Sequence, residues 1–334
     1  MSADTLLSVR DLHVHFPVGG GLFGAQRALK AVDGVSFDVK RGSTFGIVGE
    51  SGSGKSTTAL AVMRLVQITA GEVTLGGTPI GRLQGADLRR ERRRFQMVFQ
   101  DPFASLNPRK RAGDTILDAL NLMDVGKPAE RPARARELFI QTGLRPEQLQ
   151  LFPHQFSGGQ RQRIVLARAL AARPELVVCD EPVSALDVAI QAQMLNTMMS
   201  LQREFGLTYL FISHDLGVVR HMCDEVAVMY LGRIVERAPR DALFERPLHP
   251  YTRALWSAAP SFDPGTRSRA SRVRLQGDPP SPLAVPPGCR FAGRCPVAQE
   301  ACRASDPALR EVQPGHFVAC HRVDDAGRRL YAES

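Results

Sequence analysis

The chain has 334 residues, of which 43% are hydrophobic and 23% are charged, and this is an ordinary composition for a globular protein. It contains no run of about 18 apolar residues, which excludes a membrane-spanning helix. Residues 1–4 lack the basic and apolar regions of a secretory signal, so we expect a cytoplasmic protein. The net charge of +9 indicates an anionic partner, such as a nucleotide, a nucleic acid or lipid headgroups.

The first part of the chain predicts strands that lead into a glycine-rich loop. Apolar patterns indicate strands over residues 6–16, 32–39 and 44–48, and residues 17–28 form a Gly-rich connection. The third strand is followed by a complete phosphate-binding loop, which consists of Gly49, Glu50, Ser51, Gly52, Ser53, Gly54, Lys55, Ser56 and Thr57. A helical pattern with Ala59, Leu60, Met63 and Val66 on one face comes next.

This loop has the residues that phosphate binding requires. Its glycines let successive backbone N–H groups surround the β- and γ-phosphates, and the start of the helix adds partial positive charge. Lys55 neutralises phosphate charge, and the hydroxyl of Ser56 is a ligand for Mg²⁺. The alternative is a Gly/Ser-rich turn, which the complete motif between a strand and a helix disfavours. The sequence therefore predicts a nucleoside triphosphate site.

The middle of the chain alternates helices with short apolar strands. The patterns predict helices within residues 101–150 (most clearly 133–142) and over 188–205, strands over 176–179 and 208–212, and a hairpin over 226–235. Such an alternation is typical of a parallel sheet that is covered on both faces.

Two polar stretches of this region suit a phosphate site. The strand at 176–179 ends in Asp180, which can hold Mg²⁺ through its water shell, and Glu181, which can polarise an attacking water. The other stretch begins with Ser157, which can cap a helix whose first glycines expose backbone N–H groups to an anion. Acidic strand ends and capped surface helices are both common, but the phosphate loop on the same chain favours the nucleotide site.

The composition changes after about Pro260. Residues 261–288 are rich in Pro, Ser, Gly and Arg, which predicts a linker or extended strap. Four cysteines follow, and in a reducing cytoplasm such a cluster indicates metal binding rather than disulfides; they are Cys289, Cys295, Cys302 and Cys320. Four thiolates suit a tetrahedral zinc ion or an iron–sulfur cluster, and the wide spacing favours the cluster. His316 and His321 keep a Cys/His zinc site open. Cys179 and Cys223 are expected to be buried thiols.

The motifs together resemble those of the ATP-binding-cassette (ABC) ATPases over about residues 6–255. The matching residues are Gly49 to Thr57, Gln100, Ser157 to Gln160, Asp180, Glu181, Ser184 to Asp187 and His214, in the family's order and approximate spacing. The resemblance implies an α/β fold with a RecA-like P-loop core, an antiparallel β subdomain and a helical signature subdomain at about 101–170. Residues 1–260 would form this nucleotide-binding domain, and residues 261–334 a small Cys-containing C-terminal extension.

The resemblance also implies that two cassettes face each other head to tail with two ATP molecules between them. Within one chain, the residues that bind phosphate and Mg²⁺ would be Lys55, Ser56, Gln100 and Asp180. Glu181 would be the catalytic base, and His214 would contact the γ-phosphate. The partner's ATP would be contacted by the signature residues Ser157, Gly158, Gly159 and Gln160, and Asp187 would cross the dimer seam. Phe16 is a candidate to stack on adenine, with a place in the core as its alternative.

Further stretches resemble the ATP-binding subunits of bacterial oligopeptide, dipeptide and nickel importers. They are residues 31–37, 100–108, 181–187, 249–255 and the cysteine-containing tail, and the choices at 15–21 and 103–105 favour the second (F-type) of two ATPase subunits. This resemblance implies ATP-driven peptide import at the cytoplasmic face of the inner membrane. It implies a second ATPase subunit, two permease subunits and a periplasmic peptide-binding protein as partners, and a [4Fe–4S] cluster in the tail with Zn²⁺ as the alternative.

Two other functions are open to a chain with these motifs. A soluble cassette ATPase acting on nucleic acid would suit the positive charge, but such proteins usually carry two cassettes or long coiled coils. The densest basic run, Arg89 to Arg94, has no interleaved aromatic residues and is typical of a solvated helix face, so no nucleic-acid partner is expected. A regulatory protein that binds ATP without hydrolysing it is disfavoured by the intact Glu181 and His214.

Overall fold

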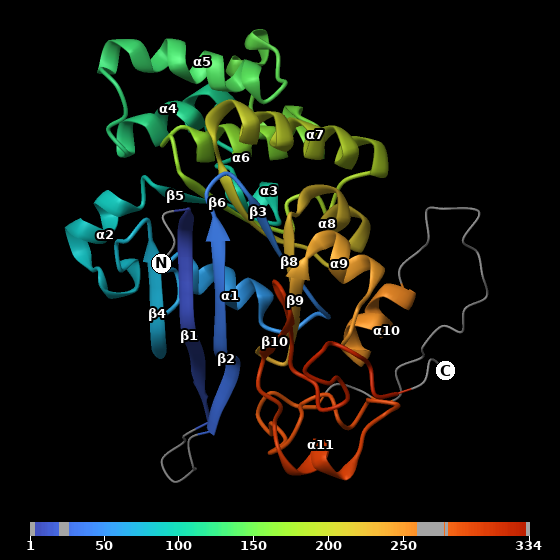
Figure 1. The fold of residues 1–334 in the computed structure, drawn as a ribbon. Helices are drawn as coiled ribbons and strands as arrows, with labels where there is room; N and C mark the ends of the chain where they lie inside the picture. The colour runs from blue at the N-terminus through green and yellow to red at the C-terminus, as the bar shows by residue number, and fades with distance from the viewer. Residues whose placement is uncertain (1–3, 20–26, 259–276, 278–279, 332–334) are drawn as a thin grey trace. The chain divides into compact units, whose positions relative to one another are not determined.

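The computed structural model describes residues 4–19, 27–258, 277 and 280–331 (Figure 1). The predicted linker at 261–288 therefore lies largely outside the described residues. The chain divides into two compact units, one made of residues 1–8, 38–44 and 74–213 and the other of residues 9–37, 45–73 and 214–334. Among the residues described, no helix combines the length and the apolar character needed to cross a membrane.

The first unit contains a parallel sheet, as the sequence predicts. Its strands are β5 (Phe95–Val98), β6 (Leu176–Asp180) and β7 (Thr208–Ile212), in the order β7-β6-β5. Cys179 of β6 lies opposite Phe211 of β7, and both side chains are fully buried. Burial of both faces explains why these strands read as continuous apolar runs rather than alternating ones.

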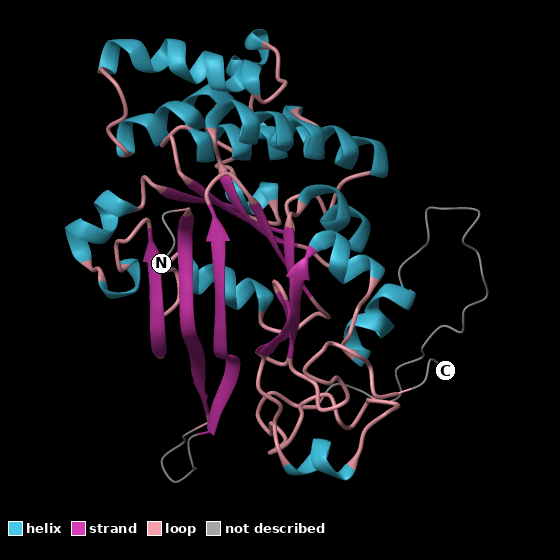
Figure 2. Cartoon of the chain, in the orientation of Figure 1, coloured by secondary structure: helices cyan, strands magenta, loops and turns pink. Residues whose placement is uncertain are grey.

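The first unit also contains helices before and between these strands, which Figure 2 draws in cyan. They are α2 (Gly85–Glu91), α3 (Pro102–Ser105), α4 (Ala112–Leu122), α5 (Arg131–Gln141), α6 (Gly158–Leu170) and α7 (Val188–Phe205), with 3₁₀ turns at Ile80–Arg82, Pro128–Glu130, Pro146–Gln150 and Pro153–Gln155. α4 packs against α5 and α6, and α6 packs against α7. α7 ends at Gly206, whose φ of +64° is the left-handed conformation that stops a helix.

The second unit carries the phosphate loop. Five of its strands pair in the order β10-β11-β9-β8-β3, and they are β3 (Thr44–Val48), β8 (Glu225–Tyr230), β9 (Arg233–Pro239), β10 (Arg310–Gln313) and β11 (His316–Val318). β3 runs parallel to β8, and the other neighbours are antiparallel, which confirms the predicted hairpin at 226–235. A three-stranded sheet has the order β2-β1-β4 and consists of β1 (Thr5–Val18), β2 (Arg27–Lys40) and β4 (Ala70–Leu75).

The helices of the second unit are short. They are α1 (Lys55–Val62), α8 (Leu216–Met222), α9 (Arg240–Glu245), α10 (Pro250–Ala258) and α11 (Glu300–Ala304). α1 is shorter than its apolar pattern suggests, because the chain turns at Arg64, whose φ is +55°. Met63 is nevertheless buried. The apolar pattern therefore predicted the burial of this residue correctly but overestimated the length of the helix.

The C-terminal residues extend the sheet of the second unit rather than forming a separate layer. Val318 of β11 pairs with Glu236 of β9 and packs in a small core with Leu248, Val312, Cys320 and Val323. The carboxylate of Glu236 is fully buried and accepts hydrogen bonds from the backbone N–H groups of Leu248 and His249 at 2.6 and 2.9 Å. It also pairs with Nε2 of His316 at 2.8 Å, which fixes this strand against β9.

Candidate nucleotide site and thiol cluster

The phosphate loop follows β3 and opens α1, and two of its glycines are sterically required. A Cβ atom at Gly49 would lie 2.2 Å from the carbonyl oxygen of Met229, and one at Gly54 would lie 2.2 Å from that of Ala31. Gly54 also has a φ of +104°, which L side chains rarely adopt. No atom would lie within 4 Å of a Cβ at Gly52, so the loop is open there. The loop therefore fits the close approach of a phosphate chain.

Lys55 is buried over its own loop. Its Nζ donates hydrogen bonds to the carbonyl oxygens of Gly49 and Glu50 at 2.9 and 2.8 Å, and it lies 3.5 Å from Oγ of Ser53. The ammonium group is thus held by backbone atoms of the motif. This arrangement presents a positive charge beside the loop N–H groups, as recognition of a triphosphate requires.

Glu50 receives contacts that the sequence patterns do not indicate. Its backbone N–H donates to the hydroxyl of Tyr251 at 2.8 Å. Its carboxylate accepts two hydrogen bonds from the guanidinium of Arg294, at 2.8 and 3.2 Å. Tyr251 lies in a stretch that resembles the importer family, but no local signal assigns it or Arg294 to the phosphate loop, which precedes them by about 200 residues or more.

The two acids predicted for the site lie at the end of β6. Gln100 donates from Nε2 to Oε2 of Glu181 at 2.9 Å. Glu181 has a φ of +48°, which is an uncommon conformation for a residue with a side chain, and its backbone N–H donates to the carbonyl of Ile212 at 2.9 Å. Such backbone outliers concentrate at functional sites, where surrounding contacts hold them in place. Asp180 is the last residue of β6.

The predicted signature begins α6. Ser157 accepts a hydrogen bond from the backbone N–H of Gln160 at 3.3 Å, and the Gln160 side chain accepts from the backbone N–H of Ser157 at 3.0 Å, which forms a capping box. A Cβ at Gly159 would lie 2.4 Å from Cγ2 of Ile190 in α7. Gly159 therefore permits the close approach of α6 and α7. Asp187 is exposed directly before α7.

The remaining predicted residues lie at the surface. Phe16 on β1 is 37% exposed, so the alternative that it belongs to the core is wrong. His214 is exposed and precedes α8, which Asp215 caps by accepting from the N–H groups of Gly217 and Val218 at 2.8 and 3.2 Å. The phosphate loop, Phe16 and His214 belong to the second unit, and Gln100, the two acids, the signature and Asp187 belong to the first.

The four C-terminal cysteines come together in the second unit. Burial is the main cause that raises the pKa of Cys289 to about 11 and of Cys320 to about 12, and it also raises the pKa of Cys295; repulsion by Cys302 adds to each shift. Among the described residues, no three of these sulfurs lie mutually within 4.8 Å. Cys179 and Cys223 are fully buried, as predicted.

Each of the four sulfurs accepts a backbone N–H group. The donors are Phe291 for Cys289, Val297 for Cys295, Gln299 for Cys302 at 3.5 Å and Arg322 for Cys320 at 3.3 Å. Such donors stabilise thiolate charge and are typical of metal-bound thiolates. The two histidines that kept a mixed site open have other partners, since His316 contacts Glu236 and His321 Nε2 contacts the carbonyl of Ser305 at 3.0 Å.

Comparison with known proteins identifies the family. Residues 32–184 match the family described as ABC transporter, and residues 235–302 match the one described as oligopeptide/dipeptide transporter, C-terminal region. The chain is 51% identical over 322 residues to a putative peptide import ATP-binding protein of Brucella ovis, which covers 96% of this chain and 99% of the relative. The chain belongs to the ABC transporter family. Its membership makes it an ATPase and confirms the fold and class predicted from the motifs.

Other relatives of this ABC transporter protein carry more specific names. It is 51% identical to the oligopeptide transport ATP-binding protein AppF of Bacillus subtilis, with 95% of this chain and 97% of the relative covered. It is 48% identical to the di/tripeptide transport ATP-binding protein DppF of Pseudomonas aeruginosa, with 96% and 98% covered. The dimeric, ADP- and phosphate-bound post-hydrolysis state of the cassette MJ0796 matches with a TM-score of 0.63 and 27% identity, over 70% of this chain and 99% of that one.

Proposed function

We propose that this protein is the ATP-hydrolysing subunit that powers import of di- and oligopeptides through separate permease subunits. The observation that carries the proposal is the sequence identity to peptide transport ATP-binding proteins, which is 48–51% over 95–96% of the chain. The complete phosphate loop with its buried Lys55 supplies the means of binding ATP. Relatedness to AppF and DppF supports the second (F-type) subunit.

Within one chain, the proposal assigns ATP to the phosphate loop, from Gly49 to Thr57. The backbone N–H groups of the loop and the ammonium of Lys55 bind the β- and γ-phosphates, and Phe16 supplies an exposed ring on which adenine stacks. Mg²⁺ would be held by Ser56, Gln100 and Asp180, and it supplies neutralisation of phosphate charge. These oxygen donors suit a hard cation.

Hydrolysis is assigned to Glu181 and His214. Glu181 orients and polarises the attacking water, and its left-handed backbone together with the contact from Gln100 holds the carboxylate in one direction. His214 contacts the γ-phosphate. Because the transferring phosphoryl group carries charge on three oxygens, positioned donors and cations supply most of the catalysis.

A second cassette completes each site in this proposal. Ser157, Gly158, Gly159 and Gln160 present the start of α6 to the ATP bound by the partner, and Asp187 lies at the seam between the two cassettes. The matched MJ0796 structures are dimeric, which supports the pairing. The second cassette is either a second copy of this chain or a different ATPase subunit. The pair docks on two permease subunits at the cytoplasmic face of the inner membrane. A periplasmic peptide-binding protein is an indirect partner.

We also propose that residues 1–260 form the nucleotide-binding domain and that residues 261–334 form an extension that holds a [4Fe–4S] cluster on Cys289, Cys295, Cys302 and Cys320. The four N–H donors to sulfur support a metal-bound thiolate set. The alternative, Zn²⁺ bound at ~2.3 Å, would hold the sulfurs about 3.8 Å apart. The wide spacing of the four cysteines along the sequence favours the larger cluster.

The proposed function is tested by affinity purification of the tagged chain from detergent-solubilised membranes, with mass spectrometry of the proteins that co-purify. Two permease subunits and a second ATPase subunit are expected, and the identity of the permeases will narrow the peptide class. A tagged chain in which Lys55 is replaced by Ala serves as the control for docking that does not need ATP. Recovery of nucleic acid in the absence of any membrane protein would contradict the proposal.

A further inference from the structure

The segment that carries the first two cluster thiols also carries two arginines that reach the phosphate loop. We call residues 289–295 the thiol loop. Arg290 directly follows Cys289, and Arg294 directly precedes Cys295. Both side chains are directed to the nucleotide-binding part of the second unit, with exposed fractions of 5% for Arg290 and 9% for Arg294. Burial of two guanidinium groups requires charged partners, and the phosphate loop and its supports provide them.

Arg294 contacts the phosphate loop directly. It donates to both carboxylate oxygens of Glu50, at 2.8 and 3.2 Å, and it lies 3.5 Å from the hydroxyl of Tyr230. A two-point guanidinium–carboxylate pair fixes direction as well as distance. The pairing with Glu50 raises the pKa of the Arg294 guanidinium against the opposing effect of burial, so the charge is retained.

Glu50 is held on each of its polar groups. Its N–H donates to Tyr251, its carbonyl accepts from Lys55, and its carboxylate accepts from Arg294. The backbone of the second residue of the phosphate motif is therefore held by one contact from α10 and one from the motif's own lysine, and its side chain is held by the thiol loop. Loss of the Arg294 contact would leave the Glu50 carboxylate without this partner beside the site where phosphates bind.

Arg290 reaches the same loop through a turn. It donates to the carbonyl of Leu231, in the turn between β8 and β9. The next residue, Gly232, donates its N–H to the carbonyl of Ser53 in the phosphate motif at 2.8 Å. Arg290 also pairs with Asp33, whose own N–H donates to the carbonyl of Gly232 at 2.9 Å. The turn is thus held between Arg290, Asp33 and the phosphate loop.

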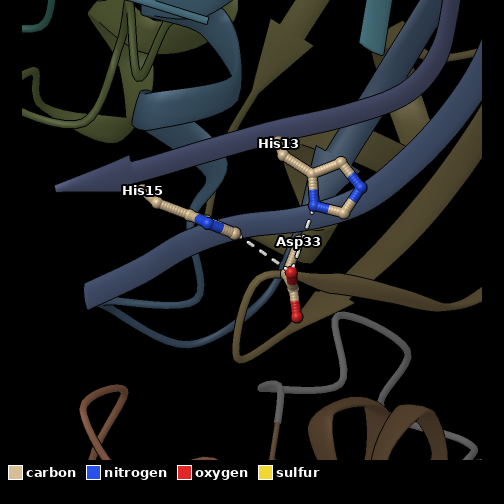
Figure 3. A group of neighbouring side chains, drawn as sticks. All are labelled: His13, His15 and Asp33. Atoms are coloured by element: carbon tan, nitrogen blue, oxygen red, sulfur yellow. Dashed lines mark hydrogen bonds and ion pairs between the residues drawn. The ribbon is translucent and has the colours of Figure 1, made fainter. Parts of the chain in front are cut away.

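Asp33 is a centre of charge pairing rather than a metal site. Figure 3 shows His13 and His15 directed to this carboxylate. Nδ1 of His13 and Nε2 of His15 each lie 3.1 Å from Oδ1 of Asp33. The geometry of these three groups alone would suit a cation. However, Oδ2 of Asp33 is paired with Arg290. The ammonium of Lys30 and the guanidinium of Arg233 also lie near this oxygen, at 3.7 and 4.0 Å. A metal ion would face three positive side chains there, so the cluster serves to anchor Arg290.

We propose that Arg294 and Arg290 are positioning residues for ATP binding, and that they make the conformation of the phosphate loop depend on the folded state of the thiol loop. The inference rests on the ATP site proposed above. When the four thiols hold the loop, both arginines are in place and the motif is ordered for phosphates. When the thiol loop is released, the support of Glu50 and Ser53 is lost and the affinity for ATP falls.

The first test measures the dissociation constant of a fluorescent ATP analogue with the purified full-length chain. Arg294→Ala is expected to raise the dissociation constant about tenfold, the size expected for the loss of a charged hydrogen-bonded pair. In steady-state hydrolysis the KM for ATP is expected to rise while kcat at saturating ATP stays within twofold. Arg294→Lys is expected to restore part of the affinity, and Arg328→Ala, which removes an exposed arginine of the same extension, is the control.

A double-mutant cycle identifies the route of the effect. In a Glu50→Gln background, Arg294→Ala is expected to change the dissociation constant less than twofold, because its partner is already altered. If Arg294→Ala does not fold, Glu50→Gln removes the same ion pair from the other side and is expected to weaken binding by a similar factor. A folded Arg294→Ala chain with unchanged affinity, or an equal effect of Arg294→Ala in both backgrounds, would overturn the inference. Failure of the unsubstituted chain to bind the analogue would instead count against the proposed ATP site.

The dependence on the thiols is tested with the same readout. Cys295→Ser is expected to raise the dissociation constant by about the same factor as Arg294→Ala, and the two substitutions together are expected to add little to either alone. Protection of the phosphate loop from hydrogen exchange should fall in both variants. Unchanged affinity and protection in Cys295→Ser, with the cluster content lost, would show that the arginines act independently of the thiols and would overturn this part of the inference.

Discussion

The side-chain amide of Gln100 donates a hydrogen bond to the carboxylate of Glu181 at 2.9 Å. The two residues are 81 positions apart and lie beyond the ends of neighbouring parallel strands, β5 and β6. Carboxyl ends of parallel strands are where such sheets gather functional groups. The contact unites a proposed Mg²⁺ ligand with the proposed catalytic base within one unit of the chain.

Glu181→Gln is expected to retain ATP binding and to reduce turnover by at least about a hundredfold, the lower range for loss of a general base. The substituted side chain keeps the oxygen that accepts from Gln100, so the local structure should persist. The variant is expected to accumulate as an ATP-bound closed dimer. Hydrolysis, nucleotide binding and size-exclusion chromatography of the purified chain measure these three properties. Glu130→Gln, at an exposed turn, is the matched control, and normal hydrolysis by the Glu181 variant would remove Glu181 from its role.

Gly159→Ala is expected to lower the free energy of unfolding by about 1 kcal/mol, because the added Cβ would lie 2.4 Å from Ile190 and overpack the contact of α6 with α7. Gly158→Ala is the control, since its Cβ would lie 3.7 Å from Leu186, an ordinary contact. Urea unfolding measures both. In an Ile190→Ala background, Gly159→Ala is expected to cause no further loss of unfolding free energy, because the side chain that the new Cβ would meet is absent. Equal stabilities of the two single glycine variants would contradict the close packing of these helices.

Cys295→Ser is expected to remove the iron and acid-labile sulfide of the proposed cluster, because the substitution takes away one of its four proposed thiolate ligands. Metal analysis by mass spectrometry and the visible absorbance of the anaerobically purified chain provide the measurement. Cys223→Ala is the control, as this fully buried thiol lies beside β3 rather than in the cluster. Zinc in place of iron in the unsubstituted chain would support the alternative metal, and unchanged metal content in the variant would exclude Cys295 as a ligand.

His249 is expected to make folding sensitive to acid. Burial lowers its pKa from 6.5 to about 4, and its Nδ1 accepts from the backbone N–H of Tyr251 at 3.0 Å. The folded chain keeps this imidazole neutral while the unfolded chain takes up a proton near pH 6.5. Stability is therefore lost as the pH falls from about 6.5 to about 4, by up to ~1.4 kcal/mol per pH unit. Urea unfolding at pH 7.5 and pH 5 measures the change.

His249→Gln retains a side-chain oxygen that can accept from Tyr251 and does not titrate. The stability of this variant is expected to depend less on pH between 7.5 and 5 than the stability of the unsubstituted chain. Identical pH dependence of the two proteins would show that His249 is not the source of the acid sensitivity.

Local patterns were sufficient for most of the regular structure. Continuous apolar runs identified β6 and β7 because both of their faces are buried, and the helix predicted over 188–205 matches the bounds of α7. Boundaries were less accurate: α5 begins at Arg131, two residues before the predicted start, and α1 ends at Val62 because the chain turns at Arg64.

Contacts between distant segments were not predictable from one sequence. Motif spacing identified Lys55, Ser157 and Glu181 because phosphate chemistry constrains the residues next to them. Arg294 and Glu50 are 244 positions apart, and no periodicity or spacing connects them. Such pairs depend on how the C-terminal residues add strands to β9, which local propensity does not encode.

Peptide import driven by this ATPase is tested by measuring ATP hydrolysis by the purified complex with its permease subunits in lipid nanodiscs. Peptide-loaded binding protein is expected to raise the rate of hydrolysis several-fold, unloaded binding protein is expected to raise it less, and DNA or RNA is expected to have no effect. A rate that responds to nucleic acid and does not respond to peptide-loaded binding protein would show that this ATPase does not drive peptide import.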